Sequence, residues 1–470
     1  MTARRPALAA ILPAYAALLC ACATPLGPGH TINKQQYEVQ WIAVNQLLVR
    51  GSYRVQNTGD RPLDYIEVTL PPESRRRDLK LVLDGVAVAP EPPARLSPAG
   101  TVRIPLRPAW PRKKKGDLVI EYLFAADGSA GTPSFYLKAG GWYPELQAHQ
   151  GLFGAGGDPP ETWDLRITVP RDFLVHASGE PKGQKRRDES VVHRFRQRRA
   201  EHLYPFVLAG RFQQHSLRSN VLRASLWSAG ELDESAARAI VQRIAQAIGV
   251  LESRFGPRSL GAESLLFVNG PASAGSAEPD AVTFPDAAWT DPGLFTGSVA
   301  DRKAAFCVAD KIVARLWFHH LARPDPDAQA LAAAFTAYAA GLVPGGCDLA
   351  AEHDFVARAI RRYDEAHAAL GTSADQREGG DDNARHQLQE SKATLFVAAL
   401  ESRLGRDVLN ASLKRMLQSL RGRIWTTNDL RVAIHVETGH DPQEFFRQWL
   451  NLSVIPASFR TKHEKTATDH

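Results

Sequence analysis

The spacing of apolar residues changes near residue 230, and this change constrains the fold more than any other feature of the chain. From about 35 to 225, apolar and polar residues alternate in short runs such as LDYIEVTL and DLVIEYLF. A period of two is typical of β-strands with one buried face. From 233 onward, apolar residues recur at helical spacing, at 240, 241, 244, 247, 248 and 251. The pattern predicts an α+β chain, in which an antiparallel β domain shaped as a saddle or a sandwich precedes a mostly helical domain.

Turn signals and composition give a division of the chain. We expect an export signal over 1–21, a linker over 22–34, the β domain over 35–225, a helical domain over 226–370, an exposed loop over 371–388, a C-terminal helical part over 389–460 and a disordered tail over 461–470. The loop assignment depends on the polar run GTSADQREGGDDNARHQL. In the C-terminal part, Thr427 is the expected N-cap of one helix and Gly439 its expected end.

The N-terminus has the layout of an export signal. Arg4 and Arg5 precede the apolar run ALAAILPAYAALL, which is too short to span a bilayer well, and LCAC follows at 19–22. LCAC resembles the box of bacterial lipoproteins, which implies cleavage before Cys22 and attachment of lipid there. Ala23 in place of Asp resembles the sorting pattern for the outer membrane, facing the periplasm. Cleavage as an ordinary secretory signal remains the alternative.

The basic residues do not form a nucleic-acid surface. The net charge is +6, and the basic runs at 75–77, 112–115 and 185–187 fall between strand-like segments without interleaved aromatic residues. We therefore expect no nucleic-acid partner. A weak attraction to anionic lipid head groups remains open.

Cys20 would leave with the signal and Cys22 would carry lipid, so the cysteines of the mature domains are Cys307 and Cys347. In an oxidising periplasm they are candidates for a disulfide, and two separate buried thiols are the alternative. Metal binding by Cys307 together with His319 is not expected, because one helix over 300–321 would place them about 18 Å apart.

Several segments, taken in order, resemble the gluzincin aminopeptidases of the membrane alanyl aminopeptidase family over nearly the whole mature chain. GWYPEL at 141–146 and EHLYPFVLAGRF at 201–212 are similar to that family's Trp-Tyr-Pro loop and to its strand leading into the catalytic domain. The C-terminal pattern of the family is matched by Phe445, Phe446, Gln448, Trp449 and Pro456. The resemblance implies a thermolysin-like fold for the helical domain.

In that family, one helix carries His-Glu-x-x-His, in which the two His bind Zn²⁺ and the Glu activates water. Alignment on Trp317 and Phe318 places Lys311 and Arg315 at the two His positions. Ile312 then stands at the position of the general base.

The other chemical positions of the family also differ in this chain. Alignment on Phe335 and Tyr338 places Ala333 at the third zinc ligand, one residue short of the family's usual separation. Alignment on Lys392 places Glu390 where the family has a Tyr that steadies the reaction intermediate.

The substituted residues cannot bind zinc. Lys has no lone pair at neutral pH, Arg has none at all, and Ile and Ala have no donor atom. The resemblance thus implies a peptidase fold with no catalytic residue, no metal and no cofactor. A relocated metal site is the alternative, and its candidate ligands are His319, His320, Glu352, His353 and Asp354. His319 and His320 are adjacent, so both cannot face one point from a helix.

Two interpretations of Lys311 and Arg315 remain open. They could form a solvated helix face with Asp310 and His319. They could instead occupy the former metal cavity and pair with carboxylates there, for which Glu278 and Glu390 are the candidates. Glu278 comes from a loose match of GSAEP to the family strand that holds the substrate's amino terminus. The residues expected to line the cleft are Glu278, Trp142 and Tyr143.

The predicted function is that of an exported, membrane-anchored lipoprotein whose peptidase-like fold acts as a non-catalytic peptide-binding, protein-binding or scaffolding module. A cationic cleft would suit a peptide or its C-terminal carboxylate. The expected partners are membrane lipid, through the acyl anchor, and a peptide or protein. One alternative is an active metalloaminopeptidase-like hydrolase with a relocated metal or altered chemistry. Another is a structural envelope protein whose cleft is filled by its own side chains.

Overall fold

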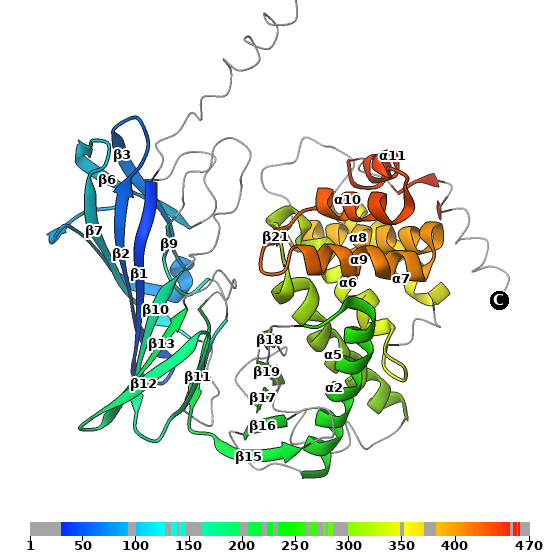
Figure 1. Ribbon diagram of the computed structural model, residues 1–470, viewed down its shortest axis with the longest axis horizontal. Helices are drawn as coiled ribbons and strands as arrows, with labels where there is room; N and C mark the ends of the chain where they lie inside the picture. Colours follow the sequence, from blue (N-terminus) through cyan, green and yellow to red (C-terminus); the bar gives the residue numbers. More distant parts are fainter. Residues whose placement is uncertain are drawn as a thin grey trace, which may run out of the picture.

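The computed structural model describes residues 30–92, 100–126, 133–138, 141–146, 162–197, 205–218, 223–228, 234–258, 264–269, 276–278, 281–284, 299–347, 352–370, 382–451, 455–457 and 459–460. A β domain and a helical domain lie side by side (Figure 1). This confirms the predicted α+β class and the order of the two parts. The export signal with Cys22 and the tail over 461–470 lie outside the described residues.

An eight-stranded sheet forms the large wall of the β domain (Figure 1). Its order is β12-β13-β10-β1-β2-β7-β4-β5, and the pairs are antiparallel except for β1 with β10. The strands are β1 His30–Ala43, β2 Gln46–Asn57, β4 Arg76–Leu83, β5 Val86–Ala87, β7 Lys115–Ala125, β10 Trp163–Pro170, β12 Glu180–Arg187 and β13 Ser190–Gln197. β1 therefore begins inside the segment predicted to be a linker.

Two smaller sheets share the core of this wall. Their orders are β6-β3-β9 and β11-β14-β8. The strands are β3 Leu63–Thr69, β6 Thr101–Trp110, β8 Ser134–Leu137, β9 Glu145–Leu146, β11 Leu174–Ala177 and β14 Val207–Gly210. Alternation explains the layering: in β2, Val49 and Tyr53 point into the core, while Arg50 and Arg54 face outward.

The helical domain is built around one large apolar core. Its helices are α2 Glu234–Phe255, α5 Val299–Arg315, α6 Gln329–Gly341, α7 Glu352–Leu370, α8 Asp382–Leu404, α9 Arg406–Ser419, α10 Thr427–Thr438 and α11 Gln443–Phe446. Among the described residues, no helix is both long enough and apolar enough to cross a bilayer.

A five-stranded sheet also belongs to the helical domain, in the order β15-β16-β17-β19-β18. Its strands are β15 Gln213–Arg218, β16 Arg223–Ser228, β17 Ser264–Asn269, β18 Ser276–Glu278 and β19 Ala281–Phe284. β16 pairs in parallel with β17, so the predicted boundary at 225 cuts through a strand of this sheet. Alternation marks a strand but does not identify its partner, which explains the difference.

Helix ends differ from the predictions in three places. A π-helical turn over Leu316–Leu321 follows α5, so 300–321 is not one regular α-helix. α8 begins at Asp382, inside the predicted loop over 371–388. The N-cap of α10 is Thr426 rather than Thr427, and it forms a reciprocal capping box with Asp429. Gly439 ends α10 with φ 73°, as predicted.

An apolar cluster joins the two domains. We call it the joint cluster, and its members are Tyr136, Phe206, Leu208, Phe212 and Trp227. Phe212 stacks on Trp227 of β16 with ring centroids 5.8 Å apart. β8 supplies Tyr136 and β14 supplies Leu208, and Phe206 directly precedes β14.

Candidate functional site

The positions that the family resemblance assigns to zinc chemistry lie on two packed helices. α5 carries Lys311, Ile312 and Arg315, and the neighbouring α6 carries Ala333. Lys311 and Arg315 have exposed side chains, Ile312 is buried in the helical core, and Ala333 is half-buried. Because none of the four side chains offers a donor atom at neutral pH, this part of the structure does not fit a zinc ion.

The apolar frame around these positions is well packed. Trp317 and Phe318 are fully buried, and Trp317 Nε1 donates to the carbonyl oxygen of Gly256 at 2.9 Å. The Phe318 ring stacks on the Phe335 ring of α6 with centroids 5.7 Å apart. The residues that anchor the alignment therefore hold α5 against α6.

A relocated metal site has little support in the described part of the chain, where no group of three or more His, Cys, Asp or Glu side chains could hold a metal ion. Burial lowers the pKa of His319 to about 3, and the charges of His320 and Arg315 add to this shift. The His319 imidazole is therefore neutral at neutral pH. Glu352, His353 and Asp354 lie in α7, and their side chains are outside the described residues.

Asp310, beside Lys311 on α5, is a buried carboxylate, with 0% of its side chain exposed. Asp310 Oδ1 accepts from Nε of Arg243 on α2 at 2.8 Å, and Oδ2 accepts from Nη2 of the same guanidinium. Burial raises the pKa of Asp310 to about 7, while Arg243 opposes the shift. The prediction that Asp310 belongs to a solvated face is therefore wrong, because Asp310 points from α5 toward α2.

The loop after α6 closes over this ion pair. Arg243 Nη1 donates to the carbonyl oxygen of Pro344 at 2.7 Å. A Cβ atom on Gly346 would lie 1.9 Å from Asp310 Oδ2 and 2.2 Å from Arg243 Nη2. Only glycine therefore fits at this point of the loop.

A disulfide fixes the same loop to α5. It joins Cys307 of α5 to Cys347, and their Cα atoms are 4.4 Å apart. Of the two alternatives left open by the sequence, the structure thus has the disulfide. Covalent and ionic links to α5 lie within a few residues of each other.

Glu390 does not pair with the α5 cations. Its Oε1 atom lies 3.2 Å from Nε2 of His386, one turn earlier on α8. In the described ranges, neither Lys311 nor Arg315 forms an ion pair with a carboxylate, which agrees with a solvated face for these two residues. The side chain of Glu278 is outside those ranges, although the backbone of its strand, β18, lies beside α5.

A polar cavity of about 450 Å³ lies between α7 and α8. Its charged lining is Arg358, Arg362 and Glu365 of α7 and Glu390 of α8, and Ser391 of α8 adds a hydroxyl. Partial burial lowers the pKa of Lys311, and the positive charge of Arg362 lowers it further. Guanidinium groups and a hydroxyl can hold a carboxylate by charge-assisted hydrogen bonds.

Trp142 and Tyr143 do not line a cleft, so this prediction is wrong. They are 1% and 2% exposed in the β-domain core. Trp142 Nε1 donates to the carbonyl oxygen of Pro205 at 2.9 Å, and the Tyr122 hydroxyl donates to the carbonyl oxygen of Trp142 at 2.7 Å. The loop is buried because two large aromatic side chains gain more by packing on Tyr37 than by exposure.

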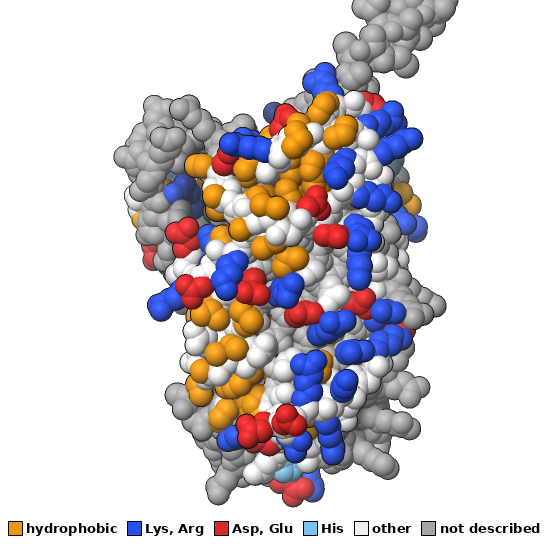
Figure 2. Space-filling model, turned by 90° about the vertical axis from the view of Figure 1, so that its left-hand side faces the viewer, with side chains coloured by type: hydrophobic (Ala, Val, Ile, Leu, Met, Phe, Trp, Pro, Cys, Tyr) orange, Lys and Arg blue, Asp and Glu red, His pale blue; other side chains and the backbone are white. Residues whose placement is uncertain are grey.

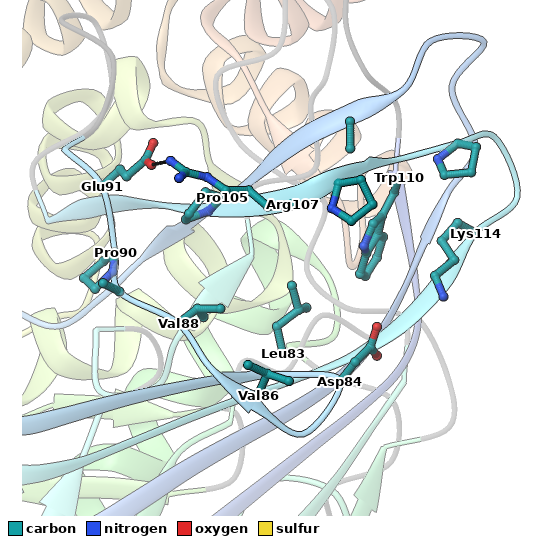
Figure 3. Close-up of a pocket in the computed structure, with 14 residues that line it drawn as sticks. Leu83, Asp84, Val86, Val88, Pro90, Glu91, Pro105, Arg107, Trp110 and Lys114 are labelled. Carbon is teal, nitrogen blue, oxygen red and sulfur yellow. Dashed lines mark hydrogen bonds and ion pairs between the residues drawn. The ribbon is translucent and has the colours of Figure 1, made fainter.

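A cavity of about 590 Å³ lies in the β domain, beside the β4–β5 hairpin and β6 (Figure 3). Val86, Val88 and Trp110 contribute apolar lining, and Arg107 pairs with Glu91 at one end at 2.8 Å. Nothing in its sequence pattern distinguishes this cavity from ordinary strand ends, which is why sequence reasoning missed it. Its lining has no nucleophile next to a base, so it suits contact rather than chemistry.

Comparison with known proteins identifies the fold. No protein-family model and no curated protein sequence matches the chain. The structure is similar to an M1 zinc metallopeptidase from Deinococcus radiodurans, with a TM-score of 0.59 and 17% identity, covering 91% of this chain and 95% of that chain. A single-residue variant of that peptidase gives a TM-score of 0.58 at 16% identity, and the variant bound to a Tyr-Ser-Ala substrate gives 0.58 at 17%; each covers 91% of this chain and 96% of that chain. This chain therefore has the fold of the M1 zinc metallopeptidases.

Proposed function

We propose that this chain is a lipid-anchored envelope protein whose peptidase-like fold binds peptides without cleaving them. The observation that carries the proposal is a contrast on α5 and α6. The buried aromatic residues there are well packed, whereas the residues at the predicted ligand positions lack metal-binding atoms. Trp317, Phe318 and Phe335 keep the helices packed, whereas Lys311 and Arg315 stand at the positions of zinc ligands. A packed frame without metal-binding atoms supports binding more than hydrolysis.

The cavity between α7 and α8 supports binding over a purely structural role. A space of about 450 Å³ lined by Arg358 and Arg362 is not filled by the protein's own side chains. Arg358 and Arg362, which share this lining with Glu365 and Glu390, are suited to the C-terminal carboxylate of a peptide. Peptides with a free carboxylate are therefore the proposed ligands.

Purified protein is expected to contain less than about one tenth of an equivalent of zinc and to bind peptides without hydrolysis, because the ligand positions lack donor atoms. Elemental analysis measures the zinc, and calorimetry measures binding of a free-acid peptide and its C-terminal amide. Arg362→Ala should weaken binding of the acid and leave binding of the amide unchanged. A relocated site would be established instead by zinc near one equivalent and cleavage of aminoacyl substrates in the wild-type protein. Both should then be lost in His319→Ala or His353→Ala. Equal affinity for the free acid and the amide would show that the protein does not recognise the C-terminal carboxylate of the peptide.

Lipid attachment at Cys22 is the proposed means of anchoring, supported by the LCAC run after an apolar segment. Cys22→Ala is expected to move the protein from the membrane fraction to the soluble periplasmic fraction after a high-salt wash, since the acyl chains are absent. Cell fractionation with immunodetection measures the distribution. Membrane association that withstands the wash in the variant would count against the anchor.

A further inference from the structure

The outward face of the eight-stranded sheet carries more cations than carboxylates. One row crosses the sheet in register from β13 to β4 and consists of Arg194, Arg166, Glu38, Arg50, Glu121 and Lys80. Cations in other rows of the same face are Lys34, Arg54, Arg77, Lys115, Lys185, Arg187 and Arg196, and the carboxylates there are Asp117, Asp164 and Glu180. Figure 2 shows a column of Lys and Arg side chains along this side of the molecule.

The carboxylates of this face are already paired. The pairs are Arg166 with Glu38 at 3.1 Å, Lys80 with Glu121 at 3.3 Å, Arg54 with Asp117 at 2.9 Å, Arg196 with Asp164, and Lys182 with Glu180. Within the described residues, Arg50 and Arg194 have no ion-pair partner, and both are exposed. Positive charge therefore remains on this face after its internal pairs are formed.

Like charges also stand directly opposite each other on adjacent strands. Arg166 of β10 faces Arg194 of β13, and Lys34 of β1 faces Arg54 of β2. Like charges in such cross-strand positions destabilise an isolated sheet. The same arrangement becomes favourable when a negatively charged surface lies against it.

We propose that this face lies on a membrane and binds the head groups of anionic phospholipids. A sheet of eight strands is about 35–40 Å wide at the usual strand spacing, so it presents its cations over an area rather than in a pocket. An extended charged plane suits this distribution better than a single small anion does. Juxtamembrane Lys and Arg side chains are attracted to anionic lipid within about a Debye length.

The path of the chain agrees with this orientation. β1, a central strand of the sheet, begins at His30, and the segment back to Cys22 spans at most about 28 Å when fully extended. A lipid anchor at Cys22 would therefore hold this sheet close to the bilayer surface. The face and the anchor are nevertheless separate features, because the charges do not depend on acylation.

The test uses the full chain with Cys22→Ala, so that no acyl chain contributes. Co-sedimentation is measured with vesicles of phosphatidylglycerol and phosphatidylcholine in equal parts and with vesicles of phosphatidylcholine alone. We expect tighter binding to the anionic vesicles at about 50 mM salt and loss of this preference at about 500 mM. Arg50→Glu combined with Arg194→Glu should lower the anionic-vesicle partition coefficient at least about tenfold.

The matched control reverses the same amount of charge on the helices, with Arg361→Glu and Lys414→Glu, both at exposed positions. This control should retain its vesicle binding, and thermal unfolding should show that both variants are folded. Equal losses in the two variants would show that net charge acts rather than this face. Absence of any preference for anionic vesicles would overturn the proposal, as would a preference for a DNA oligonucleotide over those vesicles.

Discussion

Replacing Arg243 by Met is expected to lower the free energy of unfolding by about 3–5 kcal/mol, because the Asp310 carboxylate is left buried without its partner. Both side chains are almost fully inaccessible, at 3% and 0% exposure. Asp310→Leu should cost a similar amount for the converse reason. Urea unfolding at pH 8, where Asp310 is ionised, measures both variants.

The double variant distinguishes pairing from ordinary packing. Arg243→Met with Asp310→Leu should cost much less than the two single variants together, since no buried charge remains. A loss of about 1–2 kcal/mol is still expected, because Arg243 also donates to the carbonyl oxygen of Pro344. Arg238→Met removes an exposed pair with Glu234 on the same helix and should cost under about 1 kcal/mol. Additive losses in the double variant would show that the two groups are not coupled.

Opening the disulfide is expected to lower the free energy of unfolding by about 4 kcal/mol. Cys307 and Cys347 are 40 positions apart, and closing a loop of that length removes entropy from the unfolded chain. The urea midpoint of the wild-type protein should therefore fall when reductant is added. The double variant Cys307→Ser, Cys347→Ser should have the midpoint of the reduced wild-type protein, both with and without reductant.

The thiol count provides the decisive control for that experiment. With Cys22→Ala and Cys20→Ala in place, the denatured, unreduced protein should show no free thiol. Two titratable thiols, or equal midpoints with and without reductant, would contradict the covalent link.

Periodicity predicted the class and order of the domains because burial on one face leaves a direct trace in the sequence. The alternation in β2 and the helical spacing at Ile240 and Ile244 both correspond to buried positions. The domain boundary was missed because β15 and β16 have the same alternation as the strands before them. Their pairing with β17 depends on the tertiary arrangement, which alternation does not encode.

The candidate site was predicted only in part. Trp317 and Phe318, on which the family alignment rests, are buried in the structure, whereas the assignment of Lys311 and Arg315 to ligand positions stays a prediction. The choice between Asp310 and Lys311 as the buried charge could not be made, because neighbours on a helix differ by about 100° and the facing helix was unknown. The partner of Asp310 is Arg243, which lies 67 positions earlier on α2 and carries no distinguishing local pattern.

The joint cluster determines how the two domains can move relative to each other. β14 ends at Gly210 and β15 begins at Gln213, so the connection is Arg211 and Phe212, and Phe212 is itself packed on Trp227. Rotation about an interdomain hinge needs a segment whose backbone can change without breaking apolar contacts, and this connection is part of the apolar packing. A rotation of one domain against the other would therefore have to separate Phe212 from Trp227 and expose apolar surface of the joint cluster.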